Sequence, residues 1–177
     1  MSDSDSTTPD QRTGRWMIYA AWILVLAMAT WLFQGVVQQR RNPNQEVSTR
    51  VSGQAREVTL ERNRQGHFVA SGEINGEPVT FLLDTGATDV SIPSAVADRI
   101  GLERESKVSY RTANGVAPAY LTRLDEVSIG GIRVNDIRGS INPNVDFDEV
   151  LLGMSFLERV EFSQSDGRLT LRQTTGR

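Results

Sequence analysis

The sequence predicts an all-β domain preceded by one transmembrane α-helix. Short segments in which polar and apolar residues alternate recur through the last two thirds of the chain, and turn-forming dipeptides separate them. Little of that region has helical periodicity, so the strands indicate a β-barrel or a β-sandwich. The helix is predicted by eighteen consecutive uncharged residues, Trp16 to Phe33, which precede the first alternating segment.

The apolar segment is long enough to cross a hydrocarbon core of about 30 Å as a helix. Trp16 and Trp31 lie near its two ends, as aromatic residues do at membrane interfaces. A buried core helix would have a polar face, and a signal peptide would have a small-residue cleavage site after a shorter apolar region. Neither feature is present, so we expect an uncleaved single-pass anchor at residues 16–37, after a disordered polar tail at residues 1–15.

Charge does not decide the orientation of the anchor, because arginines flank the apolar segment on both sides. A short tail before an anchor and a folded region after it are typical of a signal anchor that exports the folded region. We therefore expect an extracytoplasmic domain. Residues 38–55 are rich in Gln, Asn, Arg and Ser and are expected to form a linker without regular structure. The folded domain is expected at residues 56–172, with a C-terminal tail at residues 173–177.

Four turn-forming dipeptides divide the folded domain into hairpins. Asn75-Gly76 and Asn114-Gly115 are strong hairpin signals, because both residues of each pair accept positive φ. Gly130-Gly131 and Asp166-Gly167 separate the later strands in the same way. In chain order, we expect strands at residues 57–61, 67–74, 78–83, 89–92, 108–113, 116–124, 127–129, 132–141, 149–152, 160–162 and 169–171.

Two short helices interrupt these strands. Pro93 and Ser94 begin the first, which ends before Gly101, and the second follows an apolar strand, at residues 155–159. The hairpin at residues 108–124 is more polar than a pair of core strands would be. We therefore expect this hairpin to project from the domain.

Composition excludes several classes of function. The chain has no cysteine and therefore no disulfide and no thiolate metal site, and its single histidine, His67, excludes a His-rich metal centre. A Ser-His-Asp mechanism would depend on His67 alone as its base. The net charge of −3 argues against a nucleic-acid partner, which requires a basic face. We expect neither a metal site nor a nucleic-acid partner.

One acidic residue occupies an unusual position, because the apolar strand at residues 78–83 leads directly into Asp84. An ionised carboxylate in apolar surroundings loses hydration, so this placement requires a physical reason. One interpretation is a turn at the end of a strand, where Asp and Gly are common. The other is a catalytic carboxylate on a buried loop.

A second apolar strand runs into Gly153 and is followed by a short helix, and together with Leu82–Thr88 it resembles the retropepsin-like aspartic proteases of clan AA. This resemblance covers residues 56–172 and implies a closed retropepsin-like β-barrel, equivalent to one half of a pepsin-like acid protease. Three further motifs are similar to those of membrane-anchored bacterial single-domain aspartyl proteases: Thr112–Gly115, Ile129–Ile132 and Leu151–Leu157.

The resemblance implies a role for each residue of these motifs. Asp84 is implied to be the catalytic carboxylate. Thr85 would bind across to the partner active-site loop, and Gly86 would let the backbone approach and orient the carboxylate. The residues implied to support the active-site loop are Thr85, Gly86, Ala87, Leu152 and Gly153. The residues implied to contact substrate are Thr88, Asp89, Asn114 and Gly115.

Peptide hydrolysis by this route requires two carboxylates that share one proton, and the chain contains a single Asp-Thr-Gly. A two-fold homodimer would bring the second Asp84. The resemblance therefore implies a homodimeric endopeptidase of the bacterial inner membrane, without a cofactor, whose domain lies in the periplasm and acts on peptides or proteins. Two alternatives stay open: a non-catalytic peptide-binding module of the same fold, and a structural β-domain in which the motif is accidental.

Overall fold

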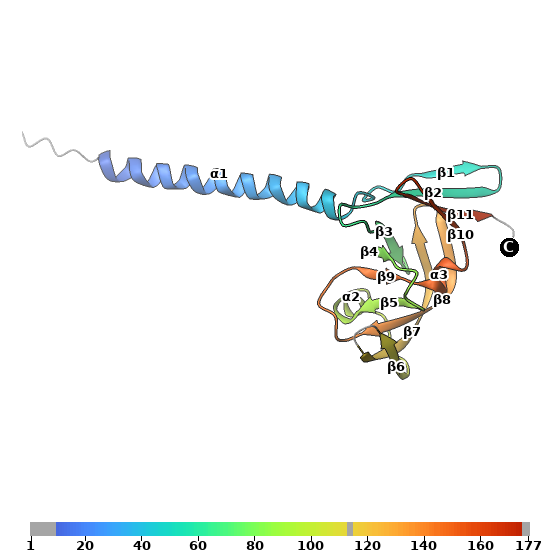
Figure 1. The fold of residues 1–177 in the computed structure, drawn as a ribbon. Helices are drawn as coiled ribbons and strands as arrows, with labels where there is room; N and C mark the ends of the chain where they lie inside the picture. Colours follow the sequence, from blue (N-terminus) through green and yellow to red (C-terminus); the bar gives the residue numbers. More distant parts are fainter. Residues whose placement is uncertain (1–9, 113–114, 175–177) are drawn as a thin grey trace, which may run out of the picture. The chain divides into compact units, whose positions relative to one another are not determined.

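The computed structural model describes residues 10–112 and 115–174. The chain divides into two compact units, and the boundary in the sequence falls between Gln39 and Arg40. The described part of the first unit is helix α1, Asp10–Arg41, whose last two residues already belong to the second unit. The second unit contains every strand and both short helices of the described residues (Figure 1).

Helix α1 exposes its apolar side chains to solvent along its length, with Trp16 74%, Leu24 68% and Phe33 69% accessible. Within the described part of the chain, it is the one helix long and apolar enough to cross a membrane. It extends beyond the expected anchor at both ends, because each residue added to an existing helix gains a backbone hydrogen bond. The expected disorder of residues 1–15 is therefore wrong from Asp10 onward, and residues 1–9 lie outside the described residues.

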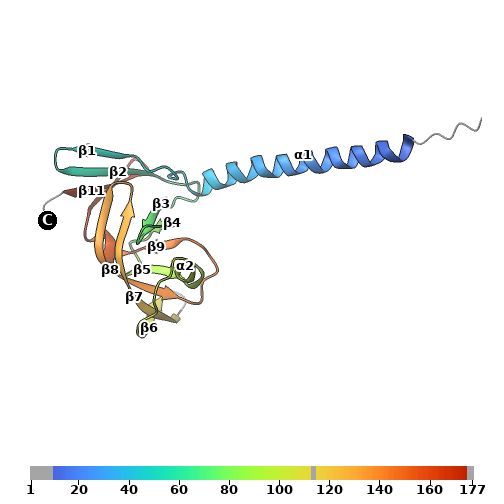
Figure 2. The same ribbon diagram turned by 180° about the vertical axis from the view of Figure 1, so that it is seen from behind.

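The domain is mostly β, as expected, and its elements follow the predicted order (Figures 1 and 2). The strands are β1 (Thr49–Ser52), β2 (Ala55–Glu61), β3 (Val69–Ile74), β4 (Glu77–Leu83), β5 (Val90–Pro93), β6 (Lys107–Thr112), β7 (Gly115–Ile129), β8 (Ile132–Asn142), β9 (Val150–Leu152), β10 (Glu161–Ser165) and β11 (Arg168–Thr174). The helices of the domain are α2 (Ser94–Arg99) and α3 (Met154–Leu157).

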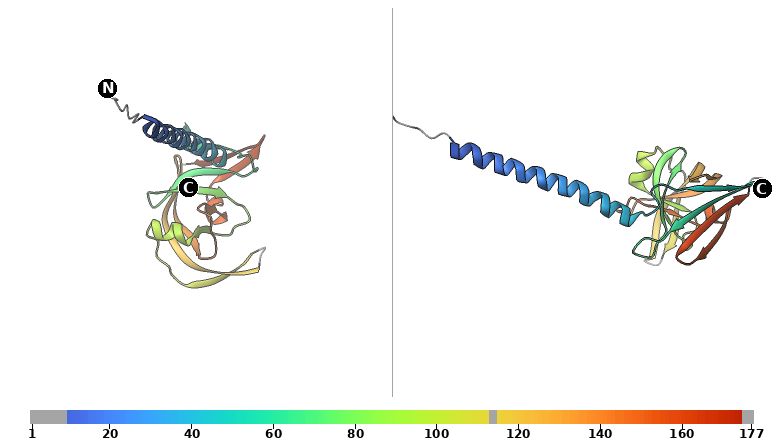
Figure 3. Two further views of the ribbon diagram at one scale, coloured as in Figure 1. Left: turned by 90° about the vertical axis from the view of Figure 1, so that its left-hand side faces the viewer. Right: turned by 90° about the horizontal axis from the view of Figure 1, so that it is seen from above.

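The larger sheet closes on itself. Its strand order is β3-β4-β9-β5-β8-β7-β6, and β3 also pairs with β7, so six of these strands form a ring from which β6 extends at the edge. The long strands β7 and β8 curve strongly, which allows the closure (Figure 3). Where the ring closes, Gly72 leaves room for the neighbouring chain, because a Cβ there would lie 2.3 Å from the carbonyl oxygen of Ser128.

The smaller sheet has the order β1-β2-β11-β10 and lies at the end of the domain away from β6 (Figure 1). Val58 and Leu60 of β2 pair with Leu171 and Leu169 of β11, and all four side chains are buried. The core continues through the ring, where the helices α2 and α3 each contribute two buried apolar residues. The alternation read from the sequence therefore corresponds to inward-facing and outward-facing positions on these strands.

Strand β7 corrects one prediction. We expected a break between strands at residues 116–124 and 127–129, but β7 runs through both. The two acids in between do not interrupt it, because Asp125 faces solvent and the Glu126 carboxylate pairs with Arg133 at 2.6 Å. The expected C-terminal tail also begins too early, since β11 continues to Thr174.

The expected linker is wrong over most of its length, because α1 continues to Arg41 and the residues after it join the domain. Strand β1 pairs with β2, and before it the side chains of Asn42 and Asn44 are buried in the domain. The Asn44 amide donates to the carbonyl oxygens of Glu61 at 2.9 Å and Val69 at 2.6 Å, and its oxygen accepts from the Glu61 N–H at 2.8 Å. Its backbone carbonyl accepts from Ser71 N–H at 3.0 Å. This segment is thus part of the domain. Its polar composition suggested a linker, but its polar side chains form hydrogen bonds with backbone groups inside the domain.

Asn44→Ala is expected to destabilise the domain by about 2–4 kcal/mol, because it leaves buried backbone groups of two strands without partners. The measurement is chemical denaturation followed by the circular dichroism of the β domain. Asn135→Ala, at an exposed position of β8, is the matched control and should change stability by less than about 0.5 kcal/mol. Equal stability of both variants would contradict the assignment of Asn44 to the folded domain.

Candidate active site

Asp84 follows β4 directly and begins a tight turn. Its side chain is half-buried, and its Oδ1 accepts a hydrogen bond from Gly86 N–H at 2.8 Å. The backbone N–H of Asp84 donates to Leu152 of β9 at 3.2 Å, and its carbonyl oxygen accepts from Ala87 N–H at 3.2 Å. The turn therefore holds one carboxylate oxygen in place while the side chain stays partly accessible to solvent.

Strand β9 lies between the two strands that flank the turn. It pairs in parallel with β4 and in antiparallel orientation with β5, and its short apolar sequence suits a strand that is covered on both sides. At its end, the turn approaches Gly153 so closely that a Cβ there would lie 2.2 Å from the Asp89 carbonyl oxygen and 2.6 Å from that of Ala87. Met154 N–H then donates to the same Ala87 carbonyl at 2.8 Å. The turn is thus supported from behind by backbone atoms.

Ser155 is a residue of this site that sequence reasoning missed. Its backbone N–H donates to the Thr88 carbonyl at 2.9 Å, while its hydroxyl accepts from Val90 N–H at 3.1 Å and donates to the Arg138 carbonyl at 2.9 Å. One residue thereby joins the turn through its backbone, and β5 and β8 through its side chain. A serine in the first turn of a helix that follows a strand was the available signal, because such serines commonly bond to nearby backbone groups.

Asp89 closes the turn and is almost fully buried, with 2% of its side chain accessible. Its Oδ1 accepts from Arg138 Nε at 2.6 Å, and its Oδ2 accepts from the Tyr110 hydroxyl. Burial, and then the bond to Asp89, raise the pKa of Tyr110 to about 12, so the phenol stays protonated and donates at neutral pH. The bond to Asp89 also raises the pKa of Arg138. Both oxygens of Asp89 are therefore engaged within the chain.

The remaining residues suggested by the sequence occupy two regions. Thr85, Gly86 and Thr88 are exposed on the turn beside Asp84. Gly115 lies on another element, as the exposed first residue of β7, with φ of 110°. Asn114 lies outside the described residues. The structure thus brings Asp84–Asp89 together with Leu152 and Gly153, while the suggested substrate contact at Gly115 belongs to the β6–β7 hairpin.

Comparison with known proteins identifies this arrangement. A family described as "gag-polyprotein putative aspartyl protease" matches residues 70–159, which is about half of the chain and includes the Asp84 turn and Gly153. The chain belongs to this aspartyl protease family. The domain is also similar to the crystal structure of a retropepsin-like aspartic protease from Rickettsia conorii, with a TM-score of 0.58 and 33% sequence identity over 72% of this chain and 95% of that chain. The fold is accordingly that of a retropepsin-like clan AA protease.

Two curated relatives of this retropepsin-like protein bear the description "uncharacterized protein". One is a Sinorhizobium protein from the cobV 5′ region, 36% identical over 111 residues, which are 61% of this chain and 48% of the relative. The other is from Rickettsia prowazekii (strain Madrid E) and is 31% identical over 132 residues, which are 73% of this chain and 54% of the relative. The chain therefore spans about half the length of these relatives.

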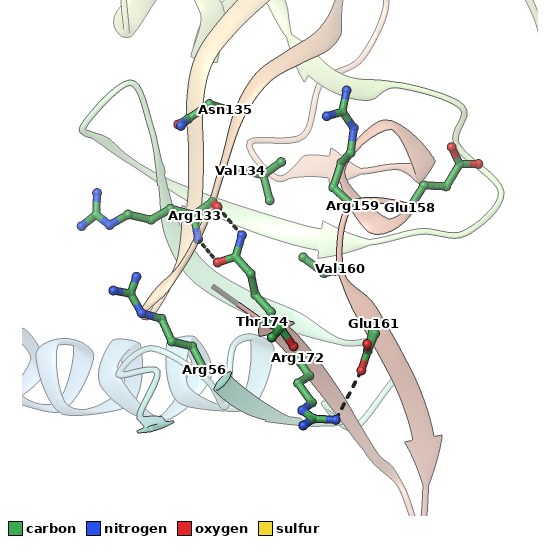
Figure 4. A pocket seen from close by; sticks show the side chains of 11 residues that line it. Arg56, Arg133, Val134, Asn135, Glu158, Arg159, Val160, Glu161, Arg172 and Thr174 are labelled. Atoms are coloured by element: carbon green, nitrogen blue, oxygen red, sulfur yellow. Dashed lines mark hydrogen bonds and ion pairs between the residues drawn. The ribbon is translucent and has the colours of Figure 1, made fainter. Parts of the chain in front are cut away.

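A separate groove of about 690 Å³ lies on the retropepsin-like domain between the smaller sheet, β8 and the end of α3 (Figure 4). The Gln173 side chain bridges part of it, donating to the Arg133 carbonyl at 2.6 Å. Two of its guanidinium groups are paired, Arg133 with Glu126 at 2.6 Å and Arg172 with Glu161 at 3.5 Å. Because the Asp84 turn does not line this groove, we assign it no part in catalysis. Its arginines are Arg56, Arg133, Arg159 and Arg172.

Acidic and imidazole side chains do not form a metal-binding cluster within residues 10–112 and 115–174 of this retropepsin-like protein. The carboxylates of the turn have different tasks. Asp89 is occupied by Tyr110 and Arg138, whereas Asp84 has one oxygen held by the turn and is partly open to solvent. The group in the turn with free chemical capacity is therefore the Asp84 carboxylate.

Proposed function

We propose that this chain is an aspartic endopeptidase that hydrolyses peptide bonds with Asp84 and the Asp84 of a second copy. The observation that supports this proposal most directly is the orientation and partial exposure of the Asp84 carboxylate in a chain of this protease family. Its carboxylate follows a buried strand, is oriented by Gly86 N–H at 2.8 Å, and stays half-exposed. This partial exposure leaves the carboxylate accessible to water and to a peptide.

The chemistry requires a second carboxylate. One carboxylate takes a proton from the attacking water, and a protonated partner donates to the carbonyl oxygen of the peptide, so the pair shares one proton and titrates as a unit. No other Asp in the sequence is followed by Thr-Gly or Ser-Gly. A two-fold axis brings the same surface of each copy together, so an axis beside the turn would pair the two Asp84 carboxylates.

The other residues of the turn fit this dimeric site. Thr85 is exposed beside Asp84 and is available to bind the partner copy's turn, while Gly86 orients the carboxylate. Gly153 and Leu152 support the turn from behind. For substrate contacts we propose the exposed Thr88 and, on the β6–β7 hairpin, Gly115 with its neighbour Asn114.

Helix α1 would tether the enzyme to a membrane. Its exposed apolar surface is unfavourable in water and is suited to a bilayer. The relatives above come from bacteria, so we propose a single-pass protein of the bacterial inner membrane with its protease domain in the periplasm. Confinement to the membrane raises the effective concentration of the copies and would favour the dimer.

Subunit mixing tests this proposal. The full chain is produced together with an excess of Asp84→Asn chains that carry a distinct tag, and cleavage of a mixed peptide library is measured per wild-type chain. If both copies supply Asp84, a ninefold excess of the variant should lower this activity about tenfold, because roughly one wild-type chain in ten then pairs with another. The same excess of Asp125→Asn chains, altered at an exposed position of β7 and still carrying Asp84, should instead raise activity per wild-type chain about tenfold, because every pair then holds two Asp84 carboxylates.

Two results would contradict the proposal. Unchanged activity per wild-type chain in the presence of Asp84→Asn chains, with mixed pairs shown by both tags, would mean that one copy suffices for catalysis. A wild-type dimer that binds peptides of the library but cleaves none at any pH would instead indicate a non-catalytic binding module.

A further inference from the structure

Asp89 is the most deeply buried carboxylate of the catalytic turn. An ionised carboxylate in an apolar interior requires partners for its oxygens, and the structure provides two. They come from different elements, Tyr110 from β6 and Arg138 from β8. The Asp89 side chain is 2% accessible, whereas that of Arg138 is 62% accessible, so the arginine reaches the carboxylate from the surface.

The strand register explains why Arg138 meets the end of the turn. Strand β5 pairs in parallel with β8, and Val90 lies opposite Gly139, so the preceding residues Asp89 and Arg138 are level with each other. Ser155 strengthens the same junction, because its hydroxyl accepts from Val90 N–H and donates to the Arg138 carbonyl. The C-terminal end of the turn is thus bonded to β8 through both side-chain and backbone groups.

The Tyr110 contact adds a third element. Tyr110 lies on β6, which pairs with β7 from Lys107–Tyr120 to Thr112–Gly115. Its half-buried ring directs the hydroxyl to Asp89 at the end of the catalytic turn. The β6–β7 hairpin and the turn that contains Asp84 are therefore joined by one side-chain hydrogen bond.

We propose that Tyr110 and Arg138 are positioning residues for Asp84, and that Asp89 acts as their anchor on the turn and does not contact substrate. By holding Asp89, they keep the turn in the geometry in which Asp84 reacts, and they couple the β6–β7 hairpin to it. The inference rests on the peptidase function proposed above. It replaces the substrate-contact role implied for Asp89, because this side chain is 2% accessible and both of its oxygens already accept hydrogen bonds within the chain.

The kinetic test uses the full chain with Tyr110→Phe, which removes one hydroxyl and keeps the ring. We expect kcat to fall by about tenfold or more and KM to rise by a smaller factor, because a misplaced turn weakens the chemical step more than it weakens the binding of substrate. Tyr120→Phe removes the hydroxyl of a half-buried tyrosine on the neighbouring strand and should change neither constant. Asp89→Asn should act in the same direction as Tyr110→Phe.

The double variant separates coupling from independent effects. If Tyr110 acts through Asp89, Tyr110→Phe together with Asp89→Asn should lower kcat little more than Asp89→Asn alone. A rise in KM with unchanged kcat in either single variant would overturn the inference, since it would indicate direct contact with substrate. Unchanged kinetics in Tyr110→Phe would overturn it as well.

Amide hydrogen exchange provides a readout that needs no activity. In Tyr110→Phe, the amides of Ala87 and Met154 should exchange at least about fivefold faster than in the wild type, while the core of β7 is unchanged. If the wild-type chain cleaves no peptide and this exchange still increases, the peptidase proposal fails and the positioning contact stands. If exchange at the turn is unaltered, the positioning inference fails whether or not the chain is a peptidase.

Discussion

Asp84→Asn is expected to lower kcat for peptide hydrolysis by about 10³-fold or more. An amide cannot take a proton from water, and in a homodimer the substitution removes both carboxylates of the pair. The change is otherwise conservative, because an Asn side-chain oxygen can still accept the 2.8 Å bond from Gly86 N–H. The turn should therefore keep its structure, and the measured loss should report the chemistry alone.

The measurement is kcat on a peptide that the wild-type full chain cleaves, with the oligomeric state checked by light scattering and the fold by circular dichroism. Asp125→Asn on β7 is the matched control, since it neutralises an exposed acid outside the turn and should keep activity within about twofold. Comparable activity of Asp84→Asn and wild type would remove Asp84 from the mechanism.

Gly153→Ala is expected to have the largest effect on stability, about 3 kcal/mol or more, and to lower activity by more than about tenfold. Its Cβ would lie 2.2 Å and 2.6 Å from two backbone carbonyl oxygens of the turn that begins at Asp84. These atoms cannot move aside independently, because the Ala87 carbonyl also accepts from Met154 N–H and the turn continues into β5. The strain must therefore displace the turn or β9.

Chemical denaturation followed by circular dichroism is the appropriate measurement, because all three tryptophans lie in α1 and do not report on the domain. The control is Gly167→Ala, in the turn between β10 and β11, where a Cβ meets open space and the cost is limited to positive φ, about 1–2 kcal/mol. A Gly153→Ala protein as stable as the control would show that the turn can shift at little cost. Full activity in that protein would show that the position of Asp84 does not depend on β9.

Local chemistry explains the predictions that were confirmed. The hairpin expected at Asn75-Gly76 forms with positive φ at both residues, 53° and 83°, because the turn type depends on two neighbouring backbones. The β class follows from alternation, which is also local. The helix α1 could be predicted from its continuous apolar segment alone, without knowledge of any contact to the rest of the chain.

Long-range contacts explain what the sequence did not reveal. Asn44 resembles a linker residue until Glu61 and Val69 are brought beside it. Asp125 and Glu126 suggest a break between two strands, but β8 pairs with β7 on both sides of Asp125, at Leu124 and at Glu126. Tyr110, Arg138 and Ser155 come from three different elements, and no spacing in the sequence relates them to Asp89.

By itself, then, the sequence determined the β class, the apolar helix and the single Asp-Thr-Gly turn, because each depends on neighbouring residues. The tertiary structure decided that the ring closes through β3 and β7, that the folded domain includes Asn42 and Asn44, and that Asp89 is held from within. These features depend on which distant backbones come within hydrogen-bond distance. That outcome is set by the packing of the whole domain.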